Sequence, residues 1–166
     1  MLLSDKDIHS EMGYGLVIEP LEDHQFQSAS VDLRLGDELR EGVYQYRIPD
    51  CGYSFKPGAF ILGSTLEYLQ IPPHLAAQFA GKSSLGRIGL QTHCTAGFID
   101  PGFRGTLTVE LSNLSGTDII LRRGQPIGQV CIFRLSSVCD RPYGHPGLRS
   151  HYLDQRGPTA AWNETE

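Results

Sequence analysis

The chain carries few of the features that mark secreted, membrane-spanning or polymer-binding proteins. Its four cysteines form no CxxC pair, which favours reduced and mostly buried thiols over disulfides or metal ligands. No apolar run approaches the roughly 20 residues of a membrane span, and the first residues lack a basic start followed by a long apolar stretch. The formal net charge of −5 argues against broad binding to nucleic acid polymers or to membranes. We therefore expect a cytoplasmic protein.

What the chain does contain is typical of a globular enzyme. Its 166 residues, 40% hydrophobic and 20% charged, suit a single domain over 1–166 that buries about two thirds of its unfolded surface. The negative net charge does not argue against a nucleotide ligand, because a triphosphate needs only a local basic cluster. Such a cluster can be drawn from Lys82, Arg87, Arg104, Arg122 and Arg123.

Short segments of alternating apolar and polar residues predict a mainly β protein. Residues 31–35 and 106–112 alternate clearly, and the first of these strands is expected to stop at Gly36-Asp37. Residues 119–121 and 129–135 are further strand candidates. The 19 glycines and 10 prolines recur at roughly regular intervals, which suits many turns between short strands. The pattern favours a β-barrel or jelly roll with a few short helices.

Helices are expected in only a few places. Ser4 is a suitable N-cap for a short first helix, with Asp7 at the third position of a capping box. Residues 73–79 and the segment after Ser83 are the helical candidates in the middle of the chain. Residues 143–166 are rich in Gly, Pro and His with weak periodicity, so we expect a mobile C-terminal tail.

The first motif with chemical potential is GKSSLGR, residues 81–87. A lysine and two hydroxyls after a glycine, at the start of a helical turn, supply backbone N–H groups and charge for an anion. Ser83 and Arg87 are four residues apart, so on a helix they share a face and can act on one ligand. The alternative for this segment on its own is a capped helix start with a solvated Lys82.

Two carboxylates follow, one on a turn and one on a strand. Asp100 precedes Pro101-Gly102, a turn signature in which an aspartate often serves only as a turn acceptor. Glu110 lies by alternation on the face of its strand that carries Thr108, opposite the apolar face of Leu107, Val109 and Leu111. The alternative for Glu110 is an ordinary solvent-facing strand residue.

A zinc site of the kind found in one class of nucleobase deaminases is not indicated. Those enzymes carry the pattern H-x-E followed by P-C-x-x-C, whereas His93-Cys94 has no downstream CxxC. A lone His-Cys pair is more often a packing feature, and deamination by this chain would have to proceed without zinc at the base.

The three motifs GKSSLGR (81–87), TAGFID (95–100) and TVE (108–110) occur in the order and spacing of a known family. The stretch 81–113 resembles the nucleotide-binding core shared by dCTP deaminases and trimeric dUTPases, and the similarity extends over nearly the whole chain. The resemblance implies a distorted jelly roll of the dUTPase-like type. It also implies a homotrimer with active sites shared between neighbouring subunits.

The resemblance assigns roles to the motif residues. In dCTP deaminases the glutamate at Glu110 is the general acid/base, and plain dUTPases lack an acid there. Ser83 and Arg87 would orient the attacking water and stabilise the charged intermediate. The carboxylate at Asp100 faces the sugar and, in dUTPases, helps to activate the water that attacks the α-phosphate. Phe103 would pack against the deoxyribose, where a 2′-hydroxyl would clash.

The same resemblance implies a larger set of nucleotide contacts, a magnesium ion held by the triphosphate rather than by protein side chains, and no zinc. The implied ligands are dCTP and dUTP, with dTTP as an inhibitor. Ser83, Ser84 and Arg87 would come from one subunit, and Asp100 and Glu110 from its neighbour, with the tail as a lid. The implied nucleotide-binding residues are Lys82, Ser83, Ser84, Leu85, Gly86, Arg87, Asp100, Phe103, Thr108, Val109, Glu110, Gln129, Tyr143, His151 and Gln155.

Two tail residues depart from the family pattern, in which a lysine is usual at His151 and a glycine at Asp154. Asp154 would repel a triphosphate if it pointed inward. The form TAGFID at 95–100 resembles bifunctional members that release dUMP and diphosphate, so we favour a bifunctional dCTP deaminase and dUTP diphosphatase. The alternatives are a deaminase that releases dUTP, a dUTPase without deaminase activity, and a nucleotide-binding protein without catalysis.

Overall fold

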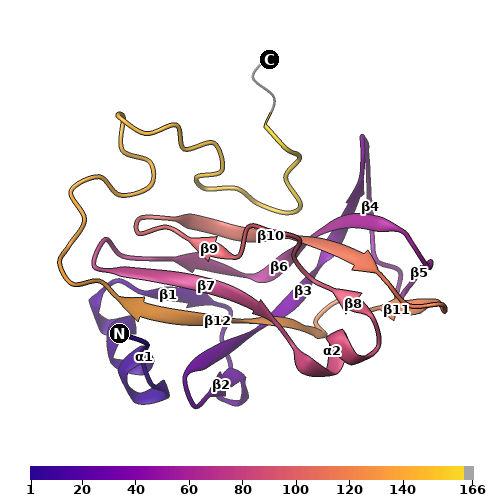
Figure 1. Ribbon diagram of the computed structural model, residues 1–166, viewed down its shortest axis with the longest axis horizontal. Helices are drawn as coiled ribbons and strands as arrows, with labels where there is room; N and C mark the ends of the chain where they lie inside the picture. Colours follow the sequence, from indigo (N-terminus) through magenta and orange to yellow (C-terminus); the bar gives the residue numbers. More distant parts are fainter. Residues whose placement is uncertain (163–166) are drawn as a thin grey trace.

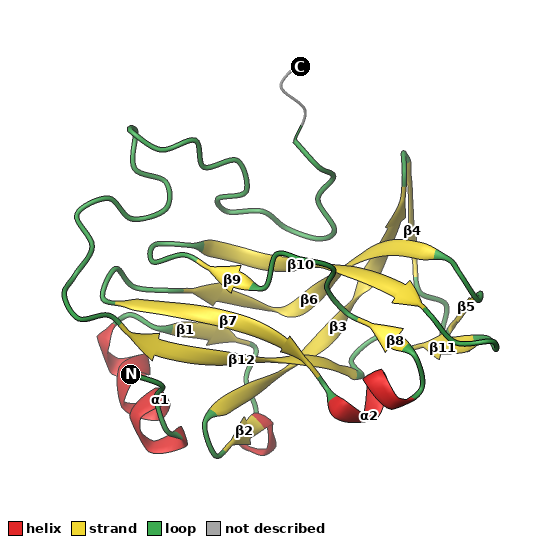
Figure 2. Ribbon diagram, viewed as in Figure 1, coloured by secondary structure: helices red, strands yellow, loops and turns green. Residues whose placement is uncertain are grey.

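The computed structural model describes residues 1–162, and strands dominate this part of the chain (Figures 1 and 2). The helical segments are short: α1 (Asp5–Glu11), the 3-10 turns η1 (Met12–Tyr14) and η2 (Asp23–Gln25), and α2 (Ser83–Arg87). The strands are β1 (Val17–Glu19), β2 (Phe26–Gln27), β3 (Ser30–Glu41), β4 (Tyr44–Arg47), β5 (Tyr53–Phe55), β6 (Phe60–Gln70), β7 (Leu75–Gly81), β8 (Leu90–Gln91), β9 (Phe98–Ile99), β10 (Arg104–Asn113), β11 (Ile119–Leu121) and β12 (Pro126–Arg134).

Most of the strands form one antiparallel sheet that curls on itself. Its order is β8-β10-β6-β3-β12-β7-β9, and β1, β2 and β4 pair at its sides, while β11 and β5 form a separate pair. Figure 2 shows the curl: β7 and β12 lie beneath β6 and β10, and β9 pairs with β7 at the end of the sheet. The prediction of a mainly β, jelly-roll type fold with a few short helices is confirmed. No helix in residues 1–162 is long and apolar enough to cross a membrane.

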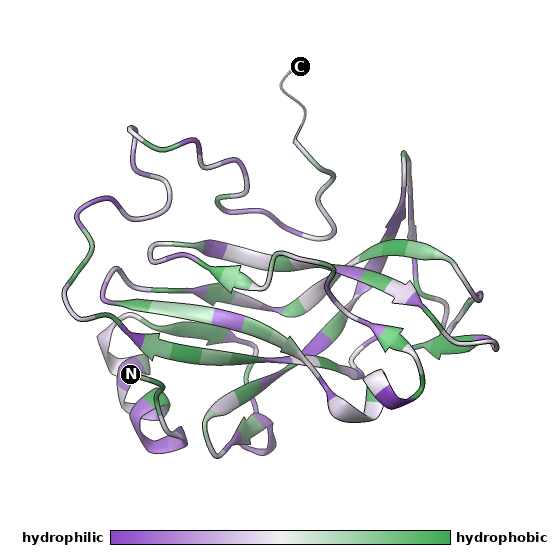
Figure 3. Ribbon diagram, in the orientation of Figure 1, coloured by the Kyte–Doolittle hydropathy of each residue, from purple (hydrophilic) through white to green (hydrophobic). Residues whose placement is uncertain are grey.

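The core lies inside the curl and is built from alternate positions of the long strands. On β10, Leu107, Val109 and Leu111 are buried, as the alternation predicted, and Val130 and Ile132 of β12 are fully buried. Burying each such side chain contributes about 1.5–3 kcal/mol. Figure 3 shows the contrast with the C-terminal tail, where hydrophilic colours are frequent while β6 and β12 carry long hydrophobic stretches.

The predicted first helix is confirmed as α1, and its N-cap is Ser4. The Ser4 hydroxyl accepts a hydrogen bond of 3.3 Å from the backbone N–H of Asp7 and donates one of 3.0 Å to the Asp7 carboxylate. The expected capping box is therefore replaced by a reciprocal pair of contacts with the serine hydroxyl. The predicted strands at 106–112 and 119–121 are confirmed as β10 and β11, and the helical turn after Ser83 as α2.

Three sequence predictions about secondary structure were wrong. The expected helix at 73–79 is strand β7, because Leu75, Ala77 and Phe79 alternate toward the core and β7 is hydrogen-bonded between β12 and β9. The strand at 31–35 does not stop at Gly36 but continues as β3 to Glu41, with a shift in register. A Cβ at Gly36 would come within 3.1 Å of the Ser64 hydroxyl, so the glycine serves a close strand contact rather than a turn.

The third wrong prediction concerns the bounds of the last strand, which was expected at 129–135. Strand β12 begins earlier, at Pro126, and ends at Arg134. Proline is tolerated at the first residue of a strand, where its missing N–H removes no ladder hydrogen bond. Of the predicted mobile tail, residues 163–166 lie outside the described part of the chain, and the mobility of the rest stays a prediction.

The N-terminal helix is fastened to the sheet by a buried carboxylate. The side chain of Glu11, only 6% exposed, contacts His74 at 2.7 Å and also forms an ion pair with Arg134. Burial alone would raise the pKa of the Glu11 carboxyl, but the hydrogen bonds from His74 and Arg134 outweigh it and hold that pKa below its ordinary value. The folded state therefore favours the ionised form of Glu11.

This carboxylate should make part of the stability dependent on pH. Because the pKa of Glu11 is lower in the folded than in the unfolded state, its contribution is present above the unfolded value of about 4.5 and is lost as the pH falls through the folded value. We expect the free energy of unfolding of wild type and Glu11→Gln to converge on acidification below about pH 4.5 in urea titrations. Asp140→Asn, at an exposed carboxylate, is the matched control. A pH-independent difference between wild type and Glu11→Gln would contradict the assignment.

Candidate active site

Several of the predicted nucleotide contacts gather around one cavity of about 490 Å³ between β10, the β9 turn and the tail. It contains both predicted carboxylates. Its walls are largely apolar, as in ligand sites where a few polar groups fix orientation. The predicted residues that line it are Asp100, Phe103, Thr108, Glu110, Tyr143 and Gln155.

Glu110 reaches the cavity because β10 alternates. Its neighbours Val109 and Leu111 are buried in the core, which turns Glu110 and Thr108 to the other face, where both are half-buried. The Oε2 atom of Glu110 accepts a hydrogen bond of 2.7 Å from the backbone N–H of Cys94. Its other carboxylate oxygen makes no hydrogen bond within residues 1–162, so it is available to a ligand or a water molecule.

The turn after β9 places Asp100 and Phe103. The N–H of Phe103 donates to the Asp100 carbonyl at 3.1 Å, and Gly102 takes the left-handed backbone (φ 89°) that the turn requires. Asp100 is exposed at the cavity rim, whereas Phe103 is buried and packs on Tyr143 with 5.9 Å between ring centroids. The backbone N–H of Tyr143 in turn donates to the Pro101 carbonyl at 2.7 Å.

The tail covers one side of this cavity. Tyr152, Gln155 and Thr159 line it, and the N–H of Thr159 donates to the Thr108 hydroxyl at 3.1 Å. The Tyr143 hydroxyl accepts a hydrogen bond of 3.0 Å from the N–H of Tyr152. Figure 1 shows the tail, at the yellow end of the colour scale, running above β9 and β10.

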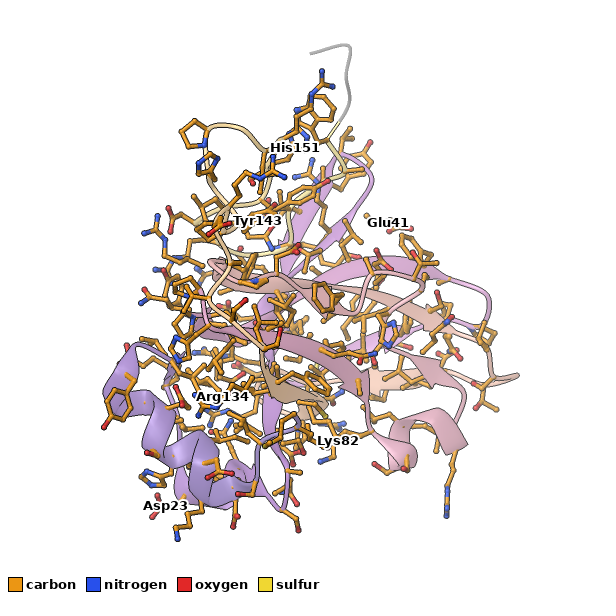
Figure 4. The ribbon with its side chains drawn as sticks, turned by 60° about the vertical axis from the view of Figure 1, so that its left-hand side comes forward. Asp23, Glu41, Lys82, Arg134, Tyr143 and His151 are labelled. Carbon is orange, nitrogen blue, oxygen red and sulfur yellow. The ribbon has the colours of Figure 1, made fainter. Side chains whose placement is uncertain are left out.

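The phosphate-type motif, residues 81–87, lies away from this cavity in the structure. None of the residues 82–87 lines the cavity of Glu110, and Ser83, Ser84 and Arg87 are exposed. Figure 4 places Lys82 at the opposite side of the body from Tyr143 and His151. Leu85 is half-buried, and Gly86 is exposed in the same short helix.

A second group of polar residues surrounds Lys82. Its ammonium forms an ion pair of 2.5 Å with Asp32 of β3, and both side chains are largely buried, 25% and 13% exposed. Gln129 of β12 is the register partner of Asp32 on one side and of Ala80 on the other. The amide oxygen of Gln129 accepts a hydrogen bond of 2.8 Å from the Ser30 hydroxyl. The structure thus joins Gln129 to the phosphate-type motif and not to Glu110.

The described chain therefore divides the predicted site residues into two separate groups. Val109 points into the core and can reach a ligand only through its backbone. His151 does not line the cavity; its ring stacks on Trp162 with 3.9 Å between centroids. Asp154 forms an ion pair of 2.8 Å with Arg104, so the expected repulsion of a triphosphate is countered by a neighbouring cation.

Sequence reasoning missed some residues that belong to these groups. His93 was read as packing together with Cys94; its ring does lie edge-on to Phe79, 5.9 Å between centroids, but it also lines the cavity. Its Nδ1 atom is buried without a hydrogen-bond partner in the described chain. The same holds for Oδ1 of Asp32. Asp32 stands at a polar position of an alternating strand, as Arg34 does, so the local pattern gave no signal that singled it out.

Comparisons with known proteins point to one family. The family model described as dCTP deaminase-like matches residues 41–135. A protein from Beutenbergia cavernae named "dCTP deaminase, dUMP-forming" is 47% identical over 180 aligned positions, covering 97% of this chain and 94% of the relative. A protein of the same name from Streptomyces coelicolor is 46% identical over 182 positions, covering 97% and 94%.

Solved structures show the same fold. A 2′-deoxycytidine 5′-triphosphate deaminase from Agrobacterium tumefaciens aligns with a TM-score of 0.68 and 25% identity, over 79% of this chain and 48% of that protein, so the chain spans about half of its length. The native EIAV dUTPase aligns with a TM-score of 0.52 and 23% identity, over 79% of this chain and 93% of that one. The second likeness concerns the fold alone.

Proposed function

This chain belongs to the dCTP deaminase-like family, and on that premise we propose that it is a dUMP-forming dCTP deaminase. It hydrolyses the cytosine amine of dCTP and the bond between the α- and β-phosphates, giving dUMP, ammonia and diphosphate. The single observation that supports the proposal best is the Glu110 carboxylate, anchored by one oxygen inside a cavity that also contains Asp100 and Phe103.

The deamination step needs a base and an acid at C4 of the base. Glu110 takes a proton from a water molecule as the water oxygen bonds to C4, and it then protonates the departing amine. The bond between C4 and the amino nitrogen breaks, ammonia leaves, and the proton that remains on the C4 hydroxyl moves to N3, which gives the C4 carbonyl of uracil. The Cys94 N–H holds one oxygen of Glu110 in place, so the other can exchange the proton without reorienting the side chain. Ser83 and Arg87 of a neighbouring chain orient the water and stabilise the intermediate.

The second step is hydrolysis at the α-phosphate. Asp100 accepts a proton from the attacking water, whose oxygen bonds to the α-phosphorus as the bond to the bridging oxygen of the diphosphate breaks. The exposed position of Asp100 at the rim of the cavity suits a group that contacts the sugar and the water beside the triphosphate. Phe103, buried beneath it, packs on the deoxyribose and leaves no room for a 2′-hydroxyl.

Magnesium is the metal that fits these residues. Among residues 1–162 no three His, Cys, Asp or Glu side chains gather as a metal site, so the triphosphate would supply most of the ligands. Asp32, beside Lys82, offers a buried carboxylate oxygen without a hydrogen-bond partner in that range, and such hard oxygen donors suit Mg²⁺ and its bound waters. When bound, the ion neutralises phosphate charge. A mutant dUTPase of phage phi11, which shares this fold at 14% identity and a TM-score of 0.51, coordinates a structural Mg(II) ion.

The separation of the two residue groups supports a homotrimer with shared sites. Lys82, Ser83, Arg87 and Gln129 of one subunit would face the cavity of Glu110 in the next, because neither group encloses a nucleotide alone. The ligands we propose are dCTP and dUTP, with dTTP as a competing nucleotide. We place the protein in the cytoplasm with these nucleotides.

Incubation with dCTP and magnesium, followed by chromatography of the products, tests the proposal. We expect dUMP, diphosphate and ammonia to appear together without accumulation of dUTP, and CTP as the control substrate to react at least about a hundredfold more slowly, because Phe103 leaves no space for its 2′-hydroxyl. Accumulating dUTP would establish a deaminase alone. Hydrolysis of dUTP without ammonia from dCTP, or binding without turnover in calorimetry, would each reject the deaminase assignment.

A further inference from the structure

Residues 154–156 of the tail lie along the start of β10 like a short added strand. The N–H of Asp154 donates to the Arg104 carbonyl at 2.7 Å, and the N–H of Thr106 donates to the Gln155 carbonyl at 3.1 Å. Gly105 and Gln155 form a parallel bridge, and a Cβ at Gly105 would come within 3.1 Å of the Gln155 backbone nitrogen. The Gln155 amide also donates to the Thr106 carbonyl at 2.7 Å. Gln155 is thus fixed at the edge of the cavity without a nucleotide.

Charged side chains fasten the tail on both sides of Gln155. On one side, Nη2 of Arg104 donates to Oδ2 of Asp154 at 2.8 Å. On the other side, the guanidinium of Arg156 lies over the ring of Tyr68 on β6, 4.1 Å from its centroid. Asp154 has a left-handed backbone (φ 59°), which aspartate adopts more readily than most residues.

We propose that Arg104, Asp154 and Arg156 are positioning residues that hold Gln155 over the cavity before a nucleotide binds. The inference rests on the proposed function, in which the tail closes on dCTP. A lid that is already docked loses less conformational freedom when the ligand binds, so the ion pair increases affinity rather than the rate of the chemical step. Arg104 also neutralises Asp154, which would otherwise stand unpaired beside a triphosphate.

The expected effect on the KM for dCTP follows from how exposed the Arg104–Asp154 ion pair is. Arg104 and Asp154 are 45% and 54% exposed. Pairs of this kind shift an equilibrium by between about 1.4-fold and 5-fold, and salt screens them. Loss of the pair should therefore raise the KM for dCTP within this range, with kcat changed less than about twofold.

Trp162 reports on the tail directly, because it is the only tryptophan in the chain. Its ring stacks on His151, and its backbone N–H donates to the Tyr152 hydroxyl at 3.0 Å. Tyr152 is in turn bonded to Tyr143, which packs on Phe103 of the body, so acrylamide quenching of Trp162 fluorescence in the nucleotide-free protein follows tail docking without any turnover. The variants are Arg104→Gln, Asp154→Gly and the double variant, and glycine keeps the left-handed backbone open.

Each single variant should raise the quenching constant about twofold, and the double variant no further, because both changes break the same pair. Added 0.5 M NaCl should raise quenching in the wild type and leave Arg104→Gln unchanged. Lys6→Gln, at an exposed lysine of helix α1, is the control for loss of one positive charge and should match the wild type.

Wild-type quenching in both single variants, or additive effects in the double variant, would contradict the proposed role of the Arg104–Asp154 ion pair in docking the tail. Because quenching needs no substrate, the two hypotheses are tested separately. Tail docking by the ion pair can be rejected while dCTP turnover is confirmed, and it can be confirmed in a protein that turns over no dCTP. An unchanged KM alongside increased quenching would also reject the proposal, since the docked tail would then add nothing to nucleotide affinity.

Discussion

Replacing Glu110 by glutamine should lower kcat for dCTP deamination by about a thousandfold, with nucleotide affinity within about threefold of the wild-type value. Glutamine keeps the size of the side chain, and its amide oxygen can still accept the hydrogen bond from the Cys94 N–H. What it loses is the oxygen that takes the proton from water. Single-turnover ammonia release gives the rate, and calorimetry with dCTP gives the affinity.

The matched control for this experiment is Glu41→Gln, which removes a carboxylate at the end of β3, away from the cavity. It should leave both quantities unchanged. Deamination by Glu110→Gln within tenfold of the wild-type rate would refute the acid/base role of this residue. A parallel loss of affinity would instead show that Glu110 only binds the base.

Local patterns were sufficient to predict β10, β11 and parts of β3 and β12, but not β6, which lies between β10 and β3 in the sheet. The alternation along residues 106–112 predicted correctly that Leu107, Val109 and Leu111 are buried and that Glu110 faces the other way. The failures arose where tertiary pairing outweighs local preference. Residues 75–80 contain helix-favouring alanines, yet β12 and β9 on either side impose a strand. A glycine at position 36 marks close strand packing as well as it marks a turn.

The candidate site was predictable as a set of residues from its motifs, whereas its division into two groups was implied only by the family resemblance. The motif order identified Ser83, Arg87, Asp100 and Glu110, but nothing in their spacing indicates that the first two lie apart from the cavity of the last two. That division follows from strand order, which sets Lys82 beside β3 and β12.

The tail shows the same limit of sequence reasoning. Asp154 reads as an unfavourable charge beside a triphosphate, because its partner Arg104 lies 50 positions earlier in the chain. Only the register of residues 154–156 against β10 brings the two together. Pairing between distant positions of opposite charge cannot be identified in a single sequence.

The separation of Arg87 from the cavity of Glu110 predicts that two inactive chains can complement each other. If Arg87 of one subunit acts on the cavity of Glu110 in the next, an Arg87→Ala chain retains an intact cavity and a Glu110→Gln chain retains an intact Arg87. Each homotrimer alone should be nearly inactive. After joint unfolding and refolding at equal concentration, about a quarter of the interfaces should combine both intact residues, so about a quarter of wild-type turnover should return.

The control mixture pairs Glu110→Gln with the double variant Arg87→Ala/Glu110→Gln, which supplies no intact cavity and should recover nothing. Light scattering confirms that each mixture consists of trimers. If Arg87 and Glu110 of one chain acted together instead, every chain in the first mixture would lack one member of the pair and no turnover would return. That result, or full wild-type activity in a monomer, would exclude the shared site. Recovery near a quarter would require that each nucleotide be bound between two subunits, with Ser83 and Arg87 from one and Asp100 and Glu110 from the other.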